Sequence, residues 1–395
     1  MYRMDEEEVE AVRRVILSHN LFRVGKSFEG HLNEVDNFEK EFACKMNSRY
    51  ALMMSGGGTA ALICGLVGMD IGPGDEVIIP SYTFIASAAS VLATGAIPVV
   101  CDIDETLTID PLDVERKISP NVKAIMPVHM VGKPADMERL KKIAEKNNIK
   151  IIEDVCQAIG GSYKQKRLGT IGDVGAFSFN YFKIISCGEG GALITDDNKI
   201  YEKSLIYHDC GANFWHYEKV NPDSIFLGLQ FRASEIMGAI MRVQLKRLDS
   251  ILYDLRNVKR MFYQALKDEP KIRFSPSNDD EGDCGVVTSF LFDSETMARK
   301  FAKAEGVNGW LPVDTDKHVF SNWTPLLRKK AGPNEKLNPY NLSENKNLRL
   351  SMTKDMCKKS IDILSRTVFI SNNPDWKEED ILKQIDACKK AARGL

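Results

Sequence analysis

One lysine stands out by its surroundings in the sequence. Lys183 follows the aromatic stretch Phe177-Ser-Phe-Asn-Tyr-Phe182, which contains no acid, and precedes the glycine-rich Gly188-Glu-Gly-Gly191. An amine in apolar surroundings loses part of its preference for the charged form. A neutral lysine can attack an aldehyde and form a Schiff base. Lys183 is therefore a candidate for covalent chemistry with a carbonyl compound, although a surface lysine would show the same pattern.

A carboxylate and an amide lie three residues apart at the end of an apolar run. Asp154 ends the run Ile151-Ile-Glu-Asp154, and Gln157 follows it. A carboxylate beside a pyridine nitrogen keeps that nitrogen protonated, and a protonated ring acts as an electron sink. Gln157 could hydrogen-bond an oxygen on the same ring. The alternative for Asp154 is the N-cap of a helix, a position that Asp favours.

Other segments offer groups for binding. Ser55-Gly-Gly-Gly-Thr59 is a glycine turn ahead of a helix, and the N–H groups at a helix N-terminus bind phosphate. No Gly-Lys-Ser/Thr follows, so this is not a Walker A loop. Ser178 is a further candidate phosphate donor. Phe84, in Pro80-Ser-Tyr-Thr-Phe84, could stack on a flat ring, although an aromatic there is more often part of the core.

The pattern of apolar runs indicates how these residues come together. Short runs that are apolar on both faces alternate with helical stretches, which predicts parallel strands with helices on both sides. The expected strands are residues 50–55, 76–80, 97–102, 124–129, 149–154, 175–179 and 191–195. Active sites of such sheets lie at the carboxyl ends of the strands. The candidate residues at positions 58, 84, 154 and 183 all follow strand ends.

The length of the chain predicts two domains. A chain of 395 residues is too long for one compact core. We expect a large α/β domain over residues 1–250 and a smaller α+β domain over 251–395. Helices are expected at 6–18, 30–46, 59–69, 81–93, 136–146, 234–266 and 378–392, from their apolar stripes.

Composition excludes several classes of partner. The formal net charge is −2, from 53 Lys and Arg against 55 Asp and Glu, so neither nucleic acid nor an anionic membrane is expected as a partner. No apolar run approaches the roughly 20 residues that span a bilayer. The nine cysteines are scattered without C-x-x-C spacing, so no metal site is expected. The N-terminus is acidic and does not resemble a secretory signal, and a reducing cytoplasm is the simplest setting.

Taken in order, these motifs resemble the DegT/StrS family of sugar aminotransferases, which have the aspartate aminotransferase fold (pyridoxal phosphate, or PLP, fold type I). The resemblance covers nearly the whole chain. The segments that carry it are Gly74-Asp-Glu-Val-Ile-Ile-Pro80, Pro127-Val-His-Met-Val-Gly132, Glu153-Asp-Val-Cys-Gln157, Phe177-Ser-Phe179 with Lys183, and Glu189-Gly-Gly191. It implies a large domain with a mostly parallel seven-stranded sheet flanked by helices, and a smaller C-terminal domain.

The resemblance also implies a role for each candidate residue. With PLP as the cofactor, Lys183 would form the Schiff base and shuttle the proton, and Asp154 would pair with the pyridine nitrogen. Gln157 would lie near the ring hydroxyl, Phe84 would stack on the ring, and Gly58, Thr59 and Ser178 would hold the phosphate. The family completes this site with an Asn from a second subunit, where this chain has Gln230, in Gly228-Leu-Gln-Phe-Arg232. A homodimer with shared active sites is therefore expected.

The implied reaction moves an amino group from glutamate to the carbonyl of a sugar. Dehydratases of the family carry His in place of the lysine, so Lys183 favours transamination. The segment Gly309–His318 lacks the His-Tyr-x-Pro motif typical of members that use nucleotide-linked sugars. The expected acceptor is therefore 3,8-dideoxy-8-oxo-octulosonate, giving 8-amino-3,8-dideoxy-octulosonate for lipopolysaccharide. A nucleotide-linked 3- or 4-keto-6-deoxyhexose is the alternative, and a PLP-dependent sugar dehydratase is a second one.

A free sugar acid would need a cationic group in the pocket. Lys317, His318 and Arg232 are candidates for it, and His208, Trp215 and His216 are further candidate pocket residues.

Two other classes of protein explain the sequence less well. A nucleotide-dependent oxidoreductase needs the full G-x-G-x-x-G motif after its first strand, but Ala61 stands at the last position and Lys183 is left without a role. A PLP-binding regulator would usually carry a DNA-binding module, and the chain has no basic helix-turn-helix extension.

Overall fold

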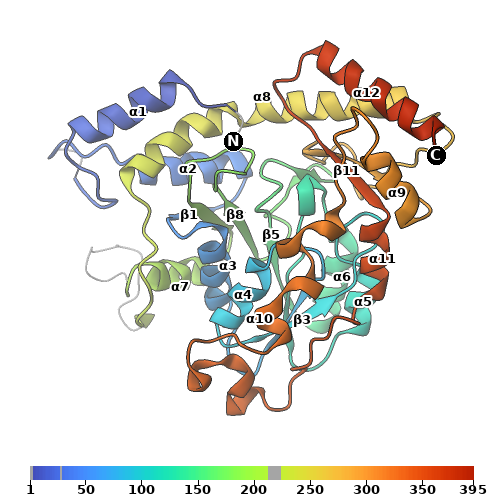
Figure 1. Ribbon diagram of the computed structural model, residues 1–395. Coiled ribbons are helices and arrows are strands. Elements are labelled where there is room, and N and C mark those ends of the chain that lie inside the picture. Colours follow the sequence, from blue (N-terminus) through green and yellow to red (C-terminus); the bar gives the residue numbers. More distant parts are fainter. Residues whose placement is uncertain (1–2, 27–28, 212–223) are drawn as a thin grey trace.

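A sheet of seven strands forms the centre of the molecule (Figure 1). The computed structural model describes residues 3–26, 29–211 and 224–395. In the order β1-β9-β8-β5-β4-β2-β3, the strands are Tyr50–Met54, Gly191–Thr195, Val174–Ser178, Lys150–Asp154, Val122–Ile125, Glu76–Pro80 and Ile97–Cys101. All run parallel except β9, which pairs antiparallel with β1 and β8. This confirms the predicted α/β fold with a mostly parallel sheet.

Helices cover both faces of the sheet because its strands are apolar on both faces. Alternate residues of β1 show the division: Leu52 and Met54 belong to one core, and Ala51 and Met53 to the other. The first core is closed by α3 (Gly57–Gly68), α4 (Ala86–Ala93) and α7 (Asn198–His208). The second is closed by α2 (Glu34–Met46), α5 (Pro111–Arg116), α6 (Met137–Asn147) and the first half of α8 (Glu235–Leu266).

Helix α8 joins the sheet to the C-terminal part of the chain and crosses the top of the molecule in Figure 1. Its first half packs on α1 (Glu6–Leu17) and α2, and its second half packs on a separate core. That core contains β10 (Val287–Leu291), β11 (Thr367–Ser371), α9 (Glu295–Ala302) and α12 (Glu378–Arg393). The predicted boundary at residue 250 falls inside α8, and this helix contributes residues to both cores. The division into two domains stays a prediction.

The chain after α9 returns to the large sheet before it ends. Val319 forms a β-bridge with Tyr82, and the backbone N–H groups of Thr83 and Ile85 donate to the carbonyls of His318 and Lys317 at 2.9 and 3.0 Å. Further on lie α10 (Thr324–Leu327) and α11 (Lys358–Ser365). This return places residues 315–318 beside the carboxyl ends of the strands.

A short hairpin, β6 (Ser162–Tyr163) with β7 (Lys166–Arg167), lies outside the main sheet. Over the described ranges, no helix combines the length and the apolar character needed to cross a membrane.

Candidate active site

One cavity at the carboxyl edge of the sheet collects most of the residues expected from the sequence. Its volume is about 630 Å³. Seven of the eight candidate residues line it: Gly58, Thr59, Phe84, Asp154, Gln157, Ser178 and Lys183. They come from the ends of β1, β2, β5 and β8, as the position of active sites in parallel sheets predicts.

The N-terminus of α3 forms one end of the cavity. The first N–H groups of a helix have no partner within it, and α3 carries neither a side-chain cap nor an acid in its first turn. Gly58 is required here, because a Cβ atom would lie 2.4 Å from the Cys156 sulfur and 3.1 Å from Ser178 Cβ. At Gly191 a Cβ would lie 2.4 Å from the Gly57 carbonyl oxygen, so the two glycine-rich turns pack backbone against backbone. The result is a cradle of N–H groups shaped for an anion.

Asp154 is buried at the end of β5, with 5% of its surface exposed. One carboxylate oxygen accepts from the Cys156 N–H at 3.1 Å, and the other accepts from the Ser87 hydroxyl at 2.9 Å. Ser87 lies 2.7 Å from the Thr83 hydroxyl. A carboxylate has about four acceptor positions, so Asp154 is fixed in place and can still accept from a ring N–H in the cavity.

Gln157 is oriented by a strained turn. The Val131 N–H donates to the Gln157 side-chain oxygen at 3.0 Å. Val131 lies in the 3-10 turn η2 (Met130–Gly132) with φ 50°, a conformation that is costly for a β-branched residue. Because the amide oxygen is occupied, the amide NH₂ group of Gln157 is the part left to donate to a ligand.

Lys183 lies on the loop between β8 and β9, and its side chain is half-buried. The loop is closed by backbone hydrogen bonds from Phe179 to Gly190 (2.7 Å) and from Tyr181 to Gly188 (2.9 Å). Lys183 lines the cavity, and within residues 3–26, 29–211 and 224–395 its ammonium forms no ion pair with an acid.

The C-terminal part supplies the opposite wall, which includes Thr315, Lys317 and His318. The Lys317 ammonium lies 5.7 Å from the centre of the Phe84 ring, within the range of a cation–π contact. The His318 ring lies 5.8 Å from that of Phe84. Burial, with the charges of Lys317 and Lys183, lowers the pKa of His318 to about 4. His318 is therefore neutral at neutral pH, which leaves Lys317 as the stronger of these two candidates for a cationic group.

A buried pair behind the cavity, Glu153 and His129, belongs to segments that carry the family resemblance, but its structural role was not predicted from the sequence. Glu153 accepts from the backbone N–H groups of Gly169, Ile171 and Gly172 at 2.7–2.8 Å. It also lies 3.0 Å from His129 Nε2, while His129 Nδ1 accepts from the Ala135 N–H at 3.1 Å. Nδ1 is thus the acceptor, so Nε2 carries the proton and donates to Glu153.

Other residues of the cavity were also missed, namely Cys156, Asn180 and Glu189. Cys156 and Glu189 belonged to recognised motifs, but nothing in the local pattern indicated that these side chains face the cavity.

The remaining candidates lie elsewhere. Gln230 is exposed and does not line the cavity of its own chain, so its role in a site shared between subunits stays a prediction. Arg232 forms an ion pair with the buried Asp209. His208 is fully buried, and its pKa is lowered to about 3 by burial. Trp215 and His216 lie outside the described residues.

The residues of the cavity fit the cofactor that the resemblance implies. An unpaired amine, a buried carboxylate, an exposed aromatic ring and an open helix N-terminus line one space of sufficient size. These are the four groups that a phosphorylated pyridine aldehyde requires, and the missing Cβ of Gly58 makes the room for its phosphate.

Comparison with known proteins gives the same result. The chain is 37% identical over 235 residues to GDP-perosamine synthase of Escherichia coli O157:H7, covering 58% of this chain and 62% of that protein. It is also 37% identical over 245 residues to dTDP-3-amino-3,4,6-trideoxy-alpha-D-glucose transaminase of Streptomyces venezuelae, covering 62% and 61%. The alignments thus span less than two thirds of these relatives.

The fold and the family model extend over more of the chain. The crystal structure of DesV from S. venezuelae superimposes with a TM-score of 0.79 at 28% identity, over 98% of this chain and 94% of that one. The model of the DegT/DnrJ/EryC1/StrS aminotransferase family matches residues 2–313. From the cavity and from this match, we conclude that the chain belongs to the DegT/DnrJ/EryC1/StrS aminotransferase family.

Proposed function

We propose that this protein is a PLP-dependent aminotransferase that moves an amino group from glutamate to a carbonyl of a sugar. The observation that carries the proposal is the meeting of Lys183, Asp154 and the open N-terminus of α3 in one cavity. PLP, when bound, supplies an electron sink that stabilises negative charge at the substrate carbon.

Each residue of the cavity would have a separate role in holding the cofactor or in moving the proton. The backbone N–H groups of Gly58 and Thr59, with Ser178, would hold the phosphate. Asp154 would keep the ring nitrogen protonated, and Gln157 would donate to the ring oxygen. Phe84 would cover the ring. Lys183 would move the proton between the substrate and cofactor carbons, since among the described basic residues of the lining Lys317 and His318 contact Phe84 and Lys183 has no aromatic or acidic partner.

The acceptor is set by the wall that the C-terminal part supplies. The family match ends at residue 313, and Thr315, Lys317 and His318 follow it. A nucleotide-linked keto-deoxyhexose is favoured by the names of the relatives. The 8-oxo-octulosonate is a second candidate, because Lys317 offers a cation for a free carboxylate. That acceptor would place the protein in lipopolysaccharide synthesis.

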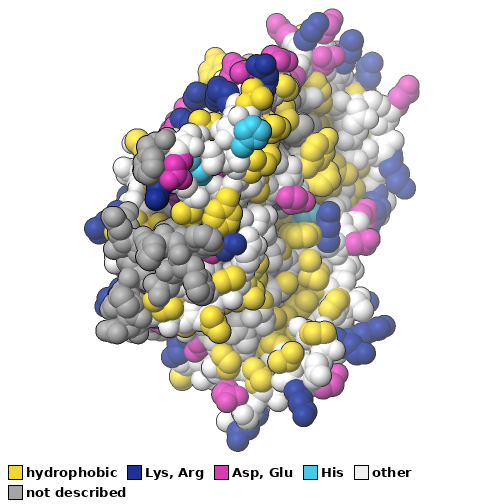
Figure 2. Space-filling model, turned by 90° about the vertical axis from the view of Figure 1, so that its left-hand side faces the viewer, with side chains coloured by type: hydrophobic (Ala, Val, Ile, Leu, Met, Phe, Trp, Pro, Cys, Tyr) yellow, Lys and Arg dark blue, Asp and Glu magenta, His cyan; other side chains and the backbone are white. Residues whose placement is uncertain are grey.

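We also propose a homodimer. Leu227 and Leu229 immediately precede Gln230 in the chain, and 86% and 50% of their surfaces are exposed. Figure 2 shows hydrophobic side chains gathered across the middle of the face that bears α1 and α7. Large exposed apolar patches mark interfaces. A second copy would cover this face and bring its own Gln230 to the cavity.

Nine free thiols suit a reducing compartment such as the cytoplasm.

The first test is the visible absorption spectrum of the protein with PLP, before and after glutamate is added. We expect a yellow band that fades with glutamate and that is absent in Lys183→Ala. A colourless wild-type protein would refute cofactor binding. A yellow protein that glutamate leaves unchanged would refute transamination from this donor and favour the dehydratase. Single-turnover assays of the glutamate-treated protein, with each class of acceptor, then separate the two sugars.

A further inference from the structure

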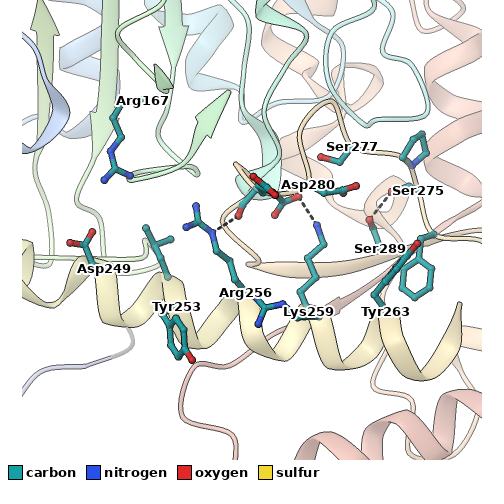
Figure 3. Close-up of a pocket in the computed structure, with 16 residues that line it drawn as sticks. Arg167, Asp249, Tyr253, Arg256, Lys259, Tyr263, Ser275, Ser277, Asp280 and Ser289 are labelled. Atoms are coloured by element: carbon teal, nitrogen blue, oxygen red, sulfur yellow. Dashed lines mark hydrogen bonds and ion pairs between the residues drawn. The ribbon is translucent and has the colours of Figure 1, made fainter. Parts of the chain in front are cut away.

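A second cavity, of about 970 Å³, lies between α8 and the segment of residues 274–289 (Figure 3). It shares no lining residue with the active-site cavity. One wall is the stripe of α8 that runs from Asp249 to Tyr263, and Arg167 of the β6–β7 hairpin faces it. The cavity is thus bounded by the sheet domain on one side and by the C-terminal part on the other.

Two guanidinium groups point into this space from opposite sides. In Figure 3, Arg167 points from its hairpin toward α8, and Arg256 points from α8 toward the hairpin and the loop above it. Arg167 donates to the Gly160 carbonyl at 2.7 Å, and Arg256 donates to the Asp283 carbonyl at 2.8 Å. Backbone carbonyls orient a guanidinium group but leave its charge uncompensated. Arginine forks held in this way match the oxygens of a phosphate.

A buried cation adds to the positive charge at the floor. Lys133, which is 1% exposed, donates to the hydroxyls of Ser275 and Ser289 at 3.0 and 3.3 Å. These hydroxyls lie 2.6 Å apart, so one donates to the other. Both serines line the cavity. Both hydroxyl oxygens accept from Lys133, and one hydroxyl donates its proton to the other. The hydroxyl that accepts this bond can therefore donate its own proton into the cavity. Burial and the charge of Lys259 lower the pKa of Lys133 to about 7, so its amine is only partly protonated at neutral pH.

The lining has as many acids as basic residues, but few of them pair with each other. Its basic residues are Arg167, Arg256, Lys259 and Arg260, and its acids are Asp249, Asp280, Glu281 and Asp283. Asp283 pairs with Lys259 at 2.6 Å, and Asp249 pairs with Lys45, outside the lining, at 2.7 Å. Arg167 and Arg256 form no ion pair with a described residue, so their guanidinium groups are available to an anion. Tyr253 and Tyr263, whose surfaces are 67% and 53% exposed, add aromatic area beside them.

We propose that this cavity binds a phosphorylated small molecule, with its phosphate between Arg167 and Arg256 and its ring along the tyrosines of α8. The guanidinium pair supplies the specificity for the anion, and the serine hydroxyls at the floor supply further donors. Tyr253 supplies a surface for an aromatic or sugar ring. Because the cavity lies outside the active site, this inference does not depend on the reaction proposed above.

The test is isothermal titration calorimetry of the full chain after it has been loaded with PLP, which fills the phosphate site at α3, and freed of unbound PLP by gel filtration. The probes are inorganic phosphate and adenosine monophosphate. Arg167→Gln should weaken the binding of both probes roughly tenfold or more, because it removes charge-assisted hydrogen bonds. Lys166→Gln is the matched control: it removes the same charge from the neighbouring residue of the hairpin, which does not line the cavity. It should bind like the wild type.

A second variant separates the ring from the phosphate. Tyr253→Ala should weaken the binding of adenosine monophosphate and leave that of inorganic phosphate unchanged. The melting temperature without a probe shows whether each variant is folded. The proposal is overturned if neither probe binds the wild type, or if Arg167→Gln and Lys166→Gln bind both probes equally well. Tighter binding of glutamate than of phosphate, lost in Arg167→Gln, would overturn the assignment to phosphate.

Discussion

Asp154 accepts one hydrogen bond on each carboxylate oxygen, from Cys156 and from Ser87. Replacing it by Asn keeps the shape but removes the charge that would hold the ring nitrogen of PLP protonated. We expect Asp154→Asn to bind PLP and to slow the glutamate-dependent fading of the visible band by about 100-fold or more. Stopped-flow absorption measures this rate. Ser87→Ala, which leaves the carboxylate in place, is the control and should lose much less. A wild-type rate in Asp154→Asn would contradict the role.

His318 gives a prediction that depends on pH. Its pKa is lowered from 6.5 to about 4 by burial and by the charges of Lys317 and Lys183. In the unfolded chain the imidazole takes up a proton below about pH 6.5, whereas in the folded protein it does so only near pH 4. The unfolded state thus binds more protons between these values, and stability falls as the pH falls through this window.

We therefore expect His318→Gln to flatten the decline in the free energy of unfolding between pH 6.5 and 4. Urea denaturation at several pH values measures it, and His19→Gln, on the N-terminal segment far from the cavity in sequence, is the control. NMR titration of the His318 ring gives a direct check. A midpoint near 6.5 would show that the ring is solvated and would count against its place in the wall.

At the scale of elements, Glu153 of β5 forms hydrogen bonds that connect this strand with two neighbouring segments of the chain. Its carboxylate holds the loop of residues 169–172 and, through His129, the segment after β4. Glu153→Gln places an NH₂ group against donors that need an acceptor. Since each hydrogen bond to a charged group contributes about 1.5–3 kcal/mol, we expect a loss of about 3 kcal/mol in the free energy of unfolding. Urea denaturation tests this, and the exposed Glu138→Gln should change stability little.

The first turn of α3 gives a second prediction at this scale. Gly58→Ala would place a methyl group 2.4 Å from the Cys156 sulfur, so the cradle for the phosphate must open. We expect PLP affinity, measured by absorption titration, to fall about tenfold or more, as for the loss of one or two hydrogen bonds to an anion. The double variant Gly58→Ala, Cys156→Ala removes the clash and should recover part of the affinity. No recovery would show that the glycine acts through its backbone alone.

The sequence predicted the elements that carry apolar periodicity and missed those that do not. All seven strands of the sheet and the long α8 were expected, because buried strands and a long amphipathic helix leave a clear pattern. Residues 81–85, expected to begin a helix, instead pair with the segment that returns from the C-terminal part, so α4 begins at Ala86. A contact over more than 200 residues leaves no local signal.

The same reasoning applies to the site. The expected residues follow strand ends, where the sheet geometry alone brings them together. Ser87 and His129 lie behind them, and Val131 lines the cavity beside them. All three act through hydrogen bonds that only the fold creates. Helices α5, α7, α9, α10 and α11 were missed as well, and four of these are at most eight residues long, too short for a periodic pattern.

At the scale of the whole molecule, the cavity is built from two parts of the chain. One side comes from the sheet, and the C-terminal part supplies Val286, Val287, Trp310, Thr315, Lys317, His318 and Ser371. The first three of these lie within the matched residues 2–313, and the others follow the match. Under the proposed function, Lys317 and His318 are the positions at which we expect a substitution to alter the choice of sugar.

The whole assembly gives the last prediction. Gln230 is exposed and outside the cavity of its own chain, so in the proposed dimer it serves the cavity of the second copy. Lys183→Ala and Gln230→Ala should then each be impaired as homodimers, and a mixed dimer should contain one intact cavity. That cavity has Lys183 from the Gln230→Ala copy and Gln230 from the Lys183→Ala copy. With random mixing of a two-fold dimer, about a quarter of all cavities are intact.

The measurement is the glutamate-dependent fading of the visible band after the two variants are unfolded together and refolded. We expect activity near a quarter of the refolded wild type, against little activity when the two variants are refolded apart and then combined. Light scattering on the same samples gives the oligomeric state. If co-refolding adds nothing to the sum of the separate variants while light scattering shows a dimer, each cavity is complete within one chain. Gln230 then belongs to the apolar interface alone.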